Sequence, residues 1–315
     1  MTISQKHGSK IPSFPISTKQ LLVATTTGLL TLPLIFYGWL HLSRPPRTPQ
    51  KRSLFQGIVY QREVRSTPRP LILHLVTIDL TAPGVRVLVT PGKPTPDNTA
   101  VNARTTTEFL SEFKLQLAIN GSFFYPFREV SPWDYYPKSG DRVNVVGEAI
   151  AKGASYSASK PNWPVLCFNA NNRTQIESSG KCPKGTIHGV AGNVLLVERG
   201  NPIGLNLDSR KGDFGKPYPR VAVAIDEEGK KLWLIAVDGK QPLYSEGATI
   251  AELTKIILDL GAYSALNLDG GGSTTLVTAT SKQPTVLNAP IHTKLPMRQR
   301  PVANHLGFYA LPQNP

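Results

Sequence analysis

The sequence is poor in cysteine, with only Cys167 and Cys182 in 315 residues, and these two do not form a C-x-x-C pair. A cysteine-based metal site is therefore not expected, and nothing in the sequence requires a cofactor. The spacing permits a disulfide, which would persist only in an oxidising compartment. Two unrelated free thiols are the alternative, and the sequence leaves this choice open.

Several common motifs are also missing. There is no G-K-[ST] Walker motif and no G-x-S-x-G elbow, which argues against a P-loop nucleotide hydrolase and an α/β-hydrolase. An actin-like kinase would need a second acidic, glycine-rich loop, and residues 57–110 contain none. The formal charge is +14, but no zinc-finger, basic-zipper or RNP motif accompanies it, so we expect no nucleic-acid partner.

Acidic residues are absent from residues 1–52, which carry seven of the basic side chains. Within them, residues 21–42 contain no Asp, Glu, Lys or Arg, and as a helix they would span roughly 33 Å, the thickness of a bilayer core. Tyr37 and Trp39 suit a membrane interface. No A-x-A cleavage site follows. The sequence thus predicts an uncleaved transmembrane anchor, single-pass, over residues 21–42.

The segments around this anchor are predicted from composition. Residues 1–20 would form a basic cytoplasmic N-terminus, and residues 43–56, basic and proline-rich, would form a linker. Basic residues flank the apolar segment on both sides, so the positive-inside rule does not by itself orient the chain. The folded body is expected over residues 57–315.

The body is predicted to be mostly β. It opens with runs rich in β-branched and apolar residues, such as LILHLVTIDL, separated by turn signals. Residues 220–239 consist of two such runs around Asp226–Lys230, with Gly229 at the turn, which indicates a β-hairpin. Residues 125–163 are rich in Pro, Gly, Ser and Tyr and are expected to form long loops.

Helices are expected at two places in the body. Residues 105–113 are a short candidate, and residues 250–260 place apolar side chains along one helical face. Thr249 and Glu252 form a T-x-x-E capping box before the second helix, and Gly261 follows it. The predicted fold class is therefore α+β, with mixed, mostly β sheets and a few packed helices after an N-terminal transmembrane helix.

The stretch LNLDGGGSTTLV, residues 266–277, raises a question of its own. Three consecutive glycines lose much backbone entropy on folding and offer no side chain to pack. They could simply turn the chain between two buried strands. Alternatively, their backbone N–H groups could approach an anionic or sugar ligand, with Asp269 supplying a carboxylate and Ser273 or Thr274 a hydroxyl.

Separated blocks of the sequence resemble the phosphodiester glycosidase family over residues 70–312. The blocks are INGSFF, PRVAVAID, the run from VDGKQPLYSEG to LNLDGGGSTTLV, and the closing RPVANHLGFY. This resemblance implies hydrolysis of a sugar linked through its anomeric carbon to a phosphodiester. The sequence lacks the EGF-like and C-terminal membrane regions found in the animal member of this family. Its arrangement is more like that of bacterial members attached to the envelope.

The resemblance implies roles for individual residues. Asp269, Asp238 and Glu252 are the candidate catalytic carboxylates, although Asp before Gly is common in turns and the capping box alone accounts for Glu252. His188 and His305 could be general acids or buried core histidines. No metal ligands are assigned. The candidate substrate-binding residues are Asn120, Gly121, Arg220, Gly270, Gly271, Gly272, Ser273, Thr274, Arg300 and Asn304.

Two functions remain open at this stage. The first is a membrane-anchored hydrolase that cleaves a sugar from a sugar-1-phosphodiester on an envelope or exopolysaccharide glycan. The second is a non-catalytic envelope protein of the same fold that binds anionic glycans. In both cases the resemblance and the cysteine pair place the body on the periplasmic or extracellular side of the cell membrane.

Overall fold

The computed structural model describes residues 18–93, 101–203 and 214–313. It divides the chain into two compact units, one ending at Leu42 and one formed by Ser43–Pro315, which we call the body. Each unit is described separately below.

The N-terminal unit contains helix α1, Thr18–Leu42. Among the described residues, no helix combines the length and the apolar character needed to cross a membrane. The predicted anchor over residues 21–42 is therefore not confirmed. Most of the predicted basic segment, residues 1–20, lies outside the described residues.

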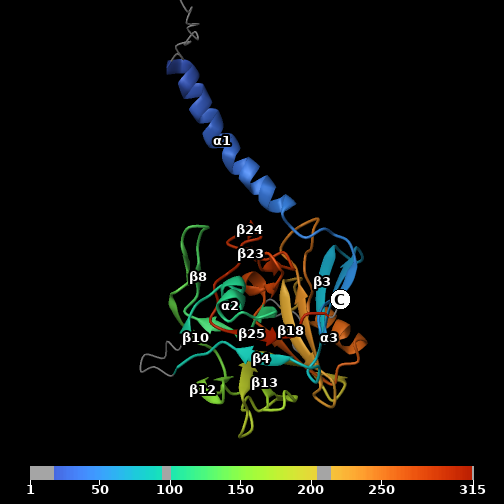
Figure 1. Cartoon of the computed structure of the whole chain (residues 1–315). Helices are drawn as coiled ribbons and strands as arrows, with labels where there is room; N and C mark the ends of the chain where they lie inside the picture. The colour runs from blue at the N-terminus through green and yellow to red at the C-terminus, as the bar shows by residue number, and fades with distance from the viewer. Residues whose placement is uncertain (1–17, 94–100, 204–213, 314–315) are drawn as a thin grey trace, which may run out of the picture. The chain divides into compact units, whose positions relative to one another are not determined.

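The body is α+β and is built around an antiparallel sheet of eight strands (Figure 1). The predicted hairpin over residues 220–239 is confirmed. Its turn is closed by the Asp226 carboxylate, which accepts hydrogen bonds from the N–H groups of Lys230 and Lys231, both at 2.9 Å.

The strands of the eight-stranded sheet are, in spatial order, β1 (Gln50–Phe55), β2 (Ile58–Arg65), β3 (Leu71–Asp79), β19 (Lys231–Val237), β18 (Arg220–Ile225), β20 (Ser264–Leu268), β16 (Val194–Glu198) and β17 (Asn201–Pro202).

A second sheet packs against one face of the first, and the main hydrophobic core lies between them. Fully buried side chains such as Val223 from the first sheet and Phe308 from the second belong to this core. In spatial order the strands of the second sheet are β22 (Thr285–Val286), β21 (Leu276–Thr278), β6 (Leu117–Asn120), β25 (His305–Tyr309) and β4 (Arg86–Val89).

A third sheet extends the same core, to which it contributes Leu166, Phe168 and Val190. Its strands are β12 (Ala154–Ser157), β11 (Ala149–Ala151), β15 (His188–Ala191), β13 (Val165–Phe168) and β14 (Thr174–Glu177). Three smaller sheets consist of β5 (Val101–Asn102), β10 (Arg142–Val145) and β7 (Phe124–Tyr125), of β23 (Ile291–His292) and β24 (Leu295–Pro296), and of β8 (Arg128–Glu129) and β9 (Tyr135–Tyr136).

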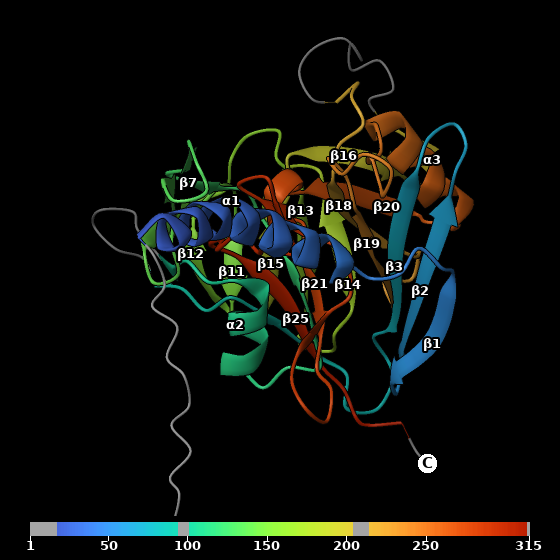
Figure 2. The same cartoon turned by 90° about the horizontal axis from the view of Figure 1, so that it is seen from above.

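Two helices cover the outer faces of the first two sheets (Figure 2). Helix α3, Ile250–Asp259, buries Leu253 and Ile257 against the large sheet, and each such side chain contributes about 2 kcal/mol. Helix α2, Thr106–Glu112, buries Phe109 and Leu110 against the second sheet. Both helices begin with a complete capping box. Because each helix packs on the outer face of one sheet, these elements form four layers in the order helix, sheet, sheet, helix.

Two segments are more ordered than their composition suggested. Residues 43–56 were predicted to be a linker, but residues 50–55 form the edge strand β1, which pairs with β2. Residues 125–163 were predicted to be long loops, but they contain short strands from β8 to β12. Strands β8 to β12 have only two to four residues and show no hydrophobic period, and β1 is polar and exposed over most of its length, so composition did not reveal either set.

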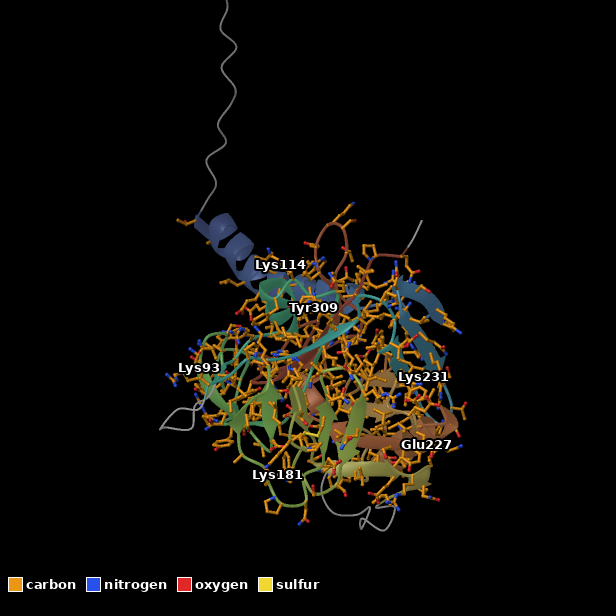
Figure 3. The ribbon with its side chains drawn as sticks, turned by 60° about the horizontal axis from the view of Figure 1, so that its bottom comes forward. Lys93, Lys114, Lys181, Glu227, Lys231 and Tyr309 are labelled. Carbon is orange, nitrogen blue, oxygen red and sulfur yellow. A yellow bond between two sulfur atoms is a disulfide. The ribbon has the colours of Figure 1, made fainter. Side chains whose placement is uncertain are left out.

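Of the two alternatives for the cysteines, the structure has the bridge: Cys167 and Cys182 form a disulfide with a sequence separation of 15 residues. Cys167 lies in β13, and the loop carrying Lys181 and Cys182 lies on the face shown in Figure 3. The bond ties this loop to the third sheet.

We expect reduction of this disulfide to lower the free energy of unfolding by about 3 kcal/mol, because a bridge across a loop of this length restricts the unfolded chain. Urea unfolding with and without a reductant measures the difference. A variant with Cys167→Ala and Cys182→Ala is the control, since its stability should not respond to the reductant. Equal stability of the oxidised and reduced wild-type protein would contradict the prediction.

Candidate active site

A cavity of about 230 Å³ opens where the two large sheets meet. Val221 of β18 lies opposite Leu268 of β20, so Arg220, before Val221, comes to lie near Asp269, after Leu268. The Asp269 N–H donates to the Gly121 carbonyl at 3.1 Å, which joins the end of β6 to the same place. The cavity is lined by Phe123, Asn193, Phe214, Tyr218, Arg220, Asn267, Asp269, Gly270, Gly271 and Arg300.

Asp269 is the only carboxylate among the described residues that line this cavity. Burial raises the pKa of Asp269 to about 6, against the opposing effects of the Arg300 charge, a Ser273 side-chain hydrogen bond and a Gly270 backbone hydrogen bond. A carboxylate with this pKa is mostly ionised at neutral pH but accepts a proton readily. It is therefore suited to general-base chemistry.

The three glycines are required by close packing. A Cβ atom on Gly270 would collide with the Pro219 carbonyl, and one on Gly272 would collide with the Arg300 guanidinium. Gly271 has φ +58°, and its Cβ would lie 2.9 Å from the Tyr218 ring. The Gly271 N–H donates to the Pro219 carbonyl at 2.9 Å. The sequence suggested that this N–H could bind an anionic or sugar ligand, but it forms a hydrogen bond within the protein.

Arg300 is held in the cavity wall by three side chains. Its Nη1 donates to Ser273 Oγ at 3.3 Å, its Nη2 donates to Glu129 Oε2 at 2.6 Å, and its Nε contacts His292 Nδ1 at 3.3 Å. Burial raises the pKa of Glu129, but Arg300 and His292 outweigh it and hold this pKa below its ordinary value. Burial and Arg300 lower the pKa of His292 to about 4. Neither Glu129 nor His292 was predicted from the sequence.

Arg220 is the second arginine of the cavity. Its Nε donates to the Ala248 carbonyl at 3.0 Å and its Nη2 to the Lys216 carbonyl at 3.1 Å. The guanidinium carbon lies 5.4 Å from the centre of the Tyr218 ring. The cavity thus presents two fixed guanidinium groups, one of them paired with Glu129, beside Asp269, and both could donate hydrogen bonds to an anionic ligand.

The family model described as phosphodiester glycosidase matches residues 113–309, a range that includes Asp269, Arg220 and Arg300. The chain belongs to the phosphodiester glycosidase family. A comparison with curated proteins found no match.

Solved structures of low identity share the fold of this family member. One is a hypothetical protein from Synechocystis, with a TM-score of 0.61 and 16% identity, covering 85% of this chain. The present chain spans 64% of the length of that protein. A second is the zebrafish N-acetylglucosamine-1-phosphodiester α-N-acetylglucosaminidase catalytic domain, auto-inhibited by its pro-peptide, with a TM-score of 0.52, 20% identity and coverage of 88% and 93% of the two chains.

A third is a putative exported protein from Burkholderia pseudomallei, with a TM-score of 0.56 and 14% identity. It covers 77% of this chain, which in turn covers 74% of it. At these identities the structures establish the shared fold alone.

Several residues predicted to bind substrate make hydrogen bonds within this family member. The Asn120 amide donates to the Asp269 carbonyl at 2.7 Å, and its oxygen accepts from the Thr275 N–H at 3.0 Å. The Asn304 side-chain amide donates to the Tyr156 hydroxyl at 2.8 Å, and the Asn304 backbone carbonyl accepts from the Gly121 N–H at 2.8 Å. The Asn120 side chain therefore holds the two ends of the glycine loop, residues 269–275.

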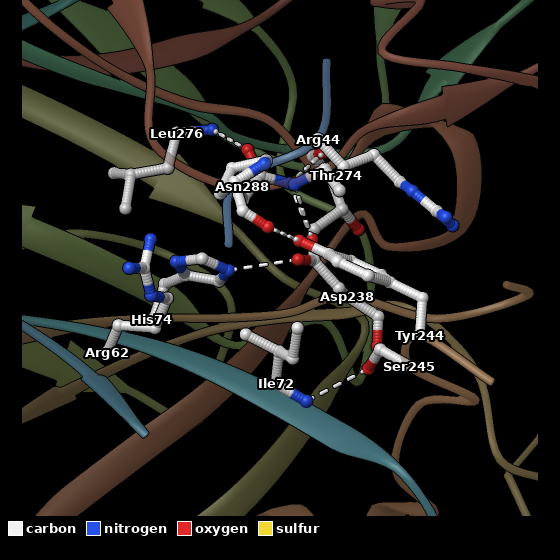
Figure 4. Close-up of polar contacts among 12 residues, drawn as sticks. Arg44, Arg62, Ile72, His74, Asp238, Tyr244, Ser245, Thr274, Leu276 and Asn288 are labelled. Carbon is white, nitrogen blue, oxygen red and sulfur yellow. Dashed lines mark hydrogen bonds and ion pairs between the residues drawn. The ribbon is translucent and has the colours of Figure 1, made fainter. Parts of the chain in front are cut away.

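Asp238, a predicted catalytic residue, is buried but does not line the cavity. Its carboxylate contacts His74 at 2.9 Å and accepts from the Asn288 amide at 3.1 Å and the Ala289 N–H at 2.9 Å (Figure 4). Asn288 in turn donates to the Thr274 carbonyl at 3.0 Å. Asp238 therefore supports Thr274, near the end of the glycine loop, through Asn288.

Glu252 and the two candidate histidines also lie outside the cavity lining. Glu252 completes the cap of α3 and pairs with Arg69. His188 and His305 are buried, and burial lowers their pKa values to about 4 and about 3, so both are neutral at pH 7. His305 stacks on Phe109 in the core.

Two asparagines that the sequence did not single out face the cavity. The Asn267 amide donates to Asn193 Oδ1 at 2.8 Å, while the Asn267 oxygen has no hydrogen-bond partner among the described residues. Across the described ranges, no group of three or more His, Cys, Asp or Glu side chains is placed to hold a metal ion.

Proposed function

We propose that this protein hydrolyses a sugar-1-phosphodiester in the cavity around Asp269. The observation that carries the proposal is the placement of one carboxylate, with a pKa of about 6, beside Arg300 and Arg220 in a single cavity. Family membership supports the reaction class. The Asn193 and Asn267 side chains, which line the same cavity, support binding of a polar sugar there.

In the proposed reaction, water attacks the anomeric carbon and transfers a proton to the Asp269 carboxylate. The bond between the anomeric carbon and the phosphate oxygen breaks, and its electron pair stays on that oxygen. Arg300 and Arg220 stabilise the negative charge that develops there. A phosphate monoester, whose second pKa is near 6, leaves as an anion without being protonated. One carboxylate is therefore sufficient for this step.

Release of free sugar tests the proposal and separates it from glycan binding without catalysis. The full-length protein is incubated with methyl N-acetylglucosaminyl phosphate and related sugar-1-phosphodiesters, and free sugar and methyl phosphate are measured. We expect both products in equal amounts. A protein that binds these compounds but releases neither product would be the non-catalytic glycan-binding protein.

We further propose that the body acts outside the cytoplasm on an envelope or exopolysaccharide glycan. The disulfide supports this location, because such bonds persist in oxidising compartments. Attachment to the cell membrane through residues 21–42 remains a prediction. Cell fractionation, combined with protease treatment of intact cells, tests both the attachment and the side on which the body lies.

The pH dependence of kcat/KM should reflect Asp269. We expect kcat/KM to fall tenfold per pH unit as the pH drops below about 6, because protonation removes the base. His292, with a pKa of about 4, does not titrate in this range. Binding of methyl N-acetylglucosaminyl phosphate, measured over the same range, serves as the control. An increase in rate as the pH falls through 6 would instead assign Asp269 as the acid.

A further inference from the structure

The hairpin formed by β8 and β9 carries an exposed apolar surface beside the cavity. Val130 is 69% exposed and Trp133 is 77% exposed, and Tyr125 and Phe127 are also exposed. In the rest of the described body, the other exposed large apolar side chains are far apart in the sequence, at Ile203, Leu243 and Leu311. A cluster of this kind usually marks a binding surface.

Internal contacts hold this hairpin in a defined shape. The N–H groups of Val130 and Ser131 donate to the Asp134 carbonyl at 3.0 and 3.1 Å. The Arg128 guanidinium pairs with the Asp134 carboxylate at 2.6 Å. The tip is therefore an ordered platform, and the Arg128 charge is balanced within it.

The hairpin is also fastened to the segment that precedes β25. Arg298 Nη1 donates to the Pro132 carbonyl at 2.8 Å, and its Nη2 contacts the Tyr135 hydroxyl at 2.9 Å. The Tyr135 ring meets His292 edge-on, with 4.8 Å between ring centres. These contacts fix the orientation of the hairpin relative to the cavity wall.

The apolar surface continues directly from the cavity. The guanidinium carbon of Arg300 lies 4.3 Å from the centre of the Phe127 ring, and Arg300 also binds Glu129 of β8. Phe123, which precedes this region, lines the cavity, and Phe124 packs edge-on against Phe127. A ligand that leaves the cavity past Arg300 would therefore meet aromatic side chains.

We propose that residues 124–136, which comprise the hairpin and the aromatic segment before it, bind sugar units of the substrate beyond the scissile phosphodiester. The protein would then act on a glycan polymer. The inference rests on the proposed function of the Asp269 cavity. Three of the four exposed apolar side chains are aromatic, and the flat apolar face of a sugar ring stacks on such rings. The balanced Arg128 charge suits uncharged sugar rings better than phosphate groups.

The test compares two probes with the full-length protein in an Asp269→Asn background, in which turnover should be slow. One probe is methyl N-acetylglucosaminyl phosphate, and the other is a synthetic trimer of N-acetylglucosamine 1-phosphate units joined by phosphodiesters. We expect Trp133→Ala to weaken binding of the trimer about tenfold, the equivalent of about 1.4 kcal/mol, and to leave binding of the methyl compound unchanged. Leu243→Ala, which truncates an isolated side chain that is 85% exposed, is the matched control.

Three outcomes would overturn the proposal. The first is unchanged trimer binding by Trp133→Ala, and the second is an equal loss for both probes, which would mean that the hairpin only shapes the cavity. The third is that Trp133→Ala weakens binding to phosphatidylglycerol vesicles but leaves trimer binding intact, which would assign the hairpin to a membrane surface. If the protein without Trp133→Ala binds neither probe, the proposed function of the cavity itself fails.

Discussion

Replacement of Asp269 by asparagine should lower kcat by about 10² to 10⁴-fold, the range expected when a general base is lost. Asparagine keeps the size of the side chain but cannot take the proton from water. Substrate affinity should change little, because the base acts mainly in the transition state. Steady-state kinetics with methyl N-acetylglucosaminyl phosphate, together with direct binding, measures both quantities.

The stability of the same variant provides its control. The folded state raises the pKa of Asp269 from 3.8 to about 6, so it binds this proton more tightly than the unfolded chain. The contribution of Asp269 to stability is therefore fully present below pH 4 and is lost as the pH rises through 6. At pH 7 the buried charge costs about 3 kcal/mol, which asparagine avoids. Asp269→Asn should thus unfold at no lower a urea concentration than the wild type, and near-wild-type turnover by the folded variant would refute the catalytic role.

Replacement of Arg300 by lysine should lower kcat/KM for a sugar phosphodiester by about 10² to 10³-fold, the usual effect of removing one group that stabilises developing charge. A lysine cannot reproduce the fork that contacts both Ser273 and Glu129. The comparison substrate is an aryl glycoside of the same sugar, which has no phosphate and should lose much less activity.

Arg86→Lys is the matched control for this change, because Arg86 lies over Tyr309 and does not line the cavity. It should retain the activity of the wild type on both substrates. An equal loss of activity on the aryl glycoside and the phosphodiester in Arg300→Lys would mean that Arg300 maintains the architecture of the site and does not contact phosphate.

The features that the sequence predicted well depend on residues close together in the chain. The capping box of α3 needs only Thr249 and Glu252, and both of its hydrogen bonds are present. The hairpin over residues 220–239 follows from two apolar, β-branched runs on either side of a short turn. Asp269 and Arg300 could be proposed together only through the family resemblance, since no local pattern relates residues so far apart.

The features that the sequence missed depend on distant contacts. Glu129 reaches Arg300 across 171 positions, from a strand of two residues that has no hydrophobic period. Asn120 illustrates a different limit, because a polar residue at the end of a buried strand has the same pattern whether it binds a ligand or the backbone. In this structure its amide bonds the backbone of the glycine loop.

The position of β25 has a consequence for how the protein is made. This strand is the last in the chain, yet it lies between β6 and β4 in the second sheet. During translation the ribosome therefore releases both neighbours long before the strand that joins them, and their edges stay open to non-native pairing. Arg300 also emerges only just before β25. We expect the second sheet and the cavity to be completed only after β25 has left the ribosome.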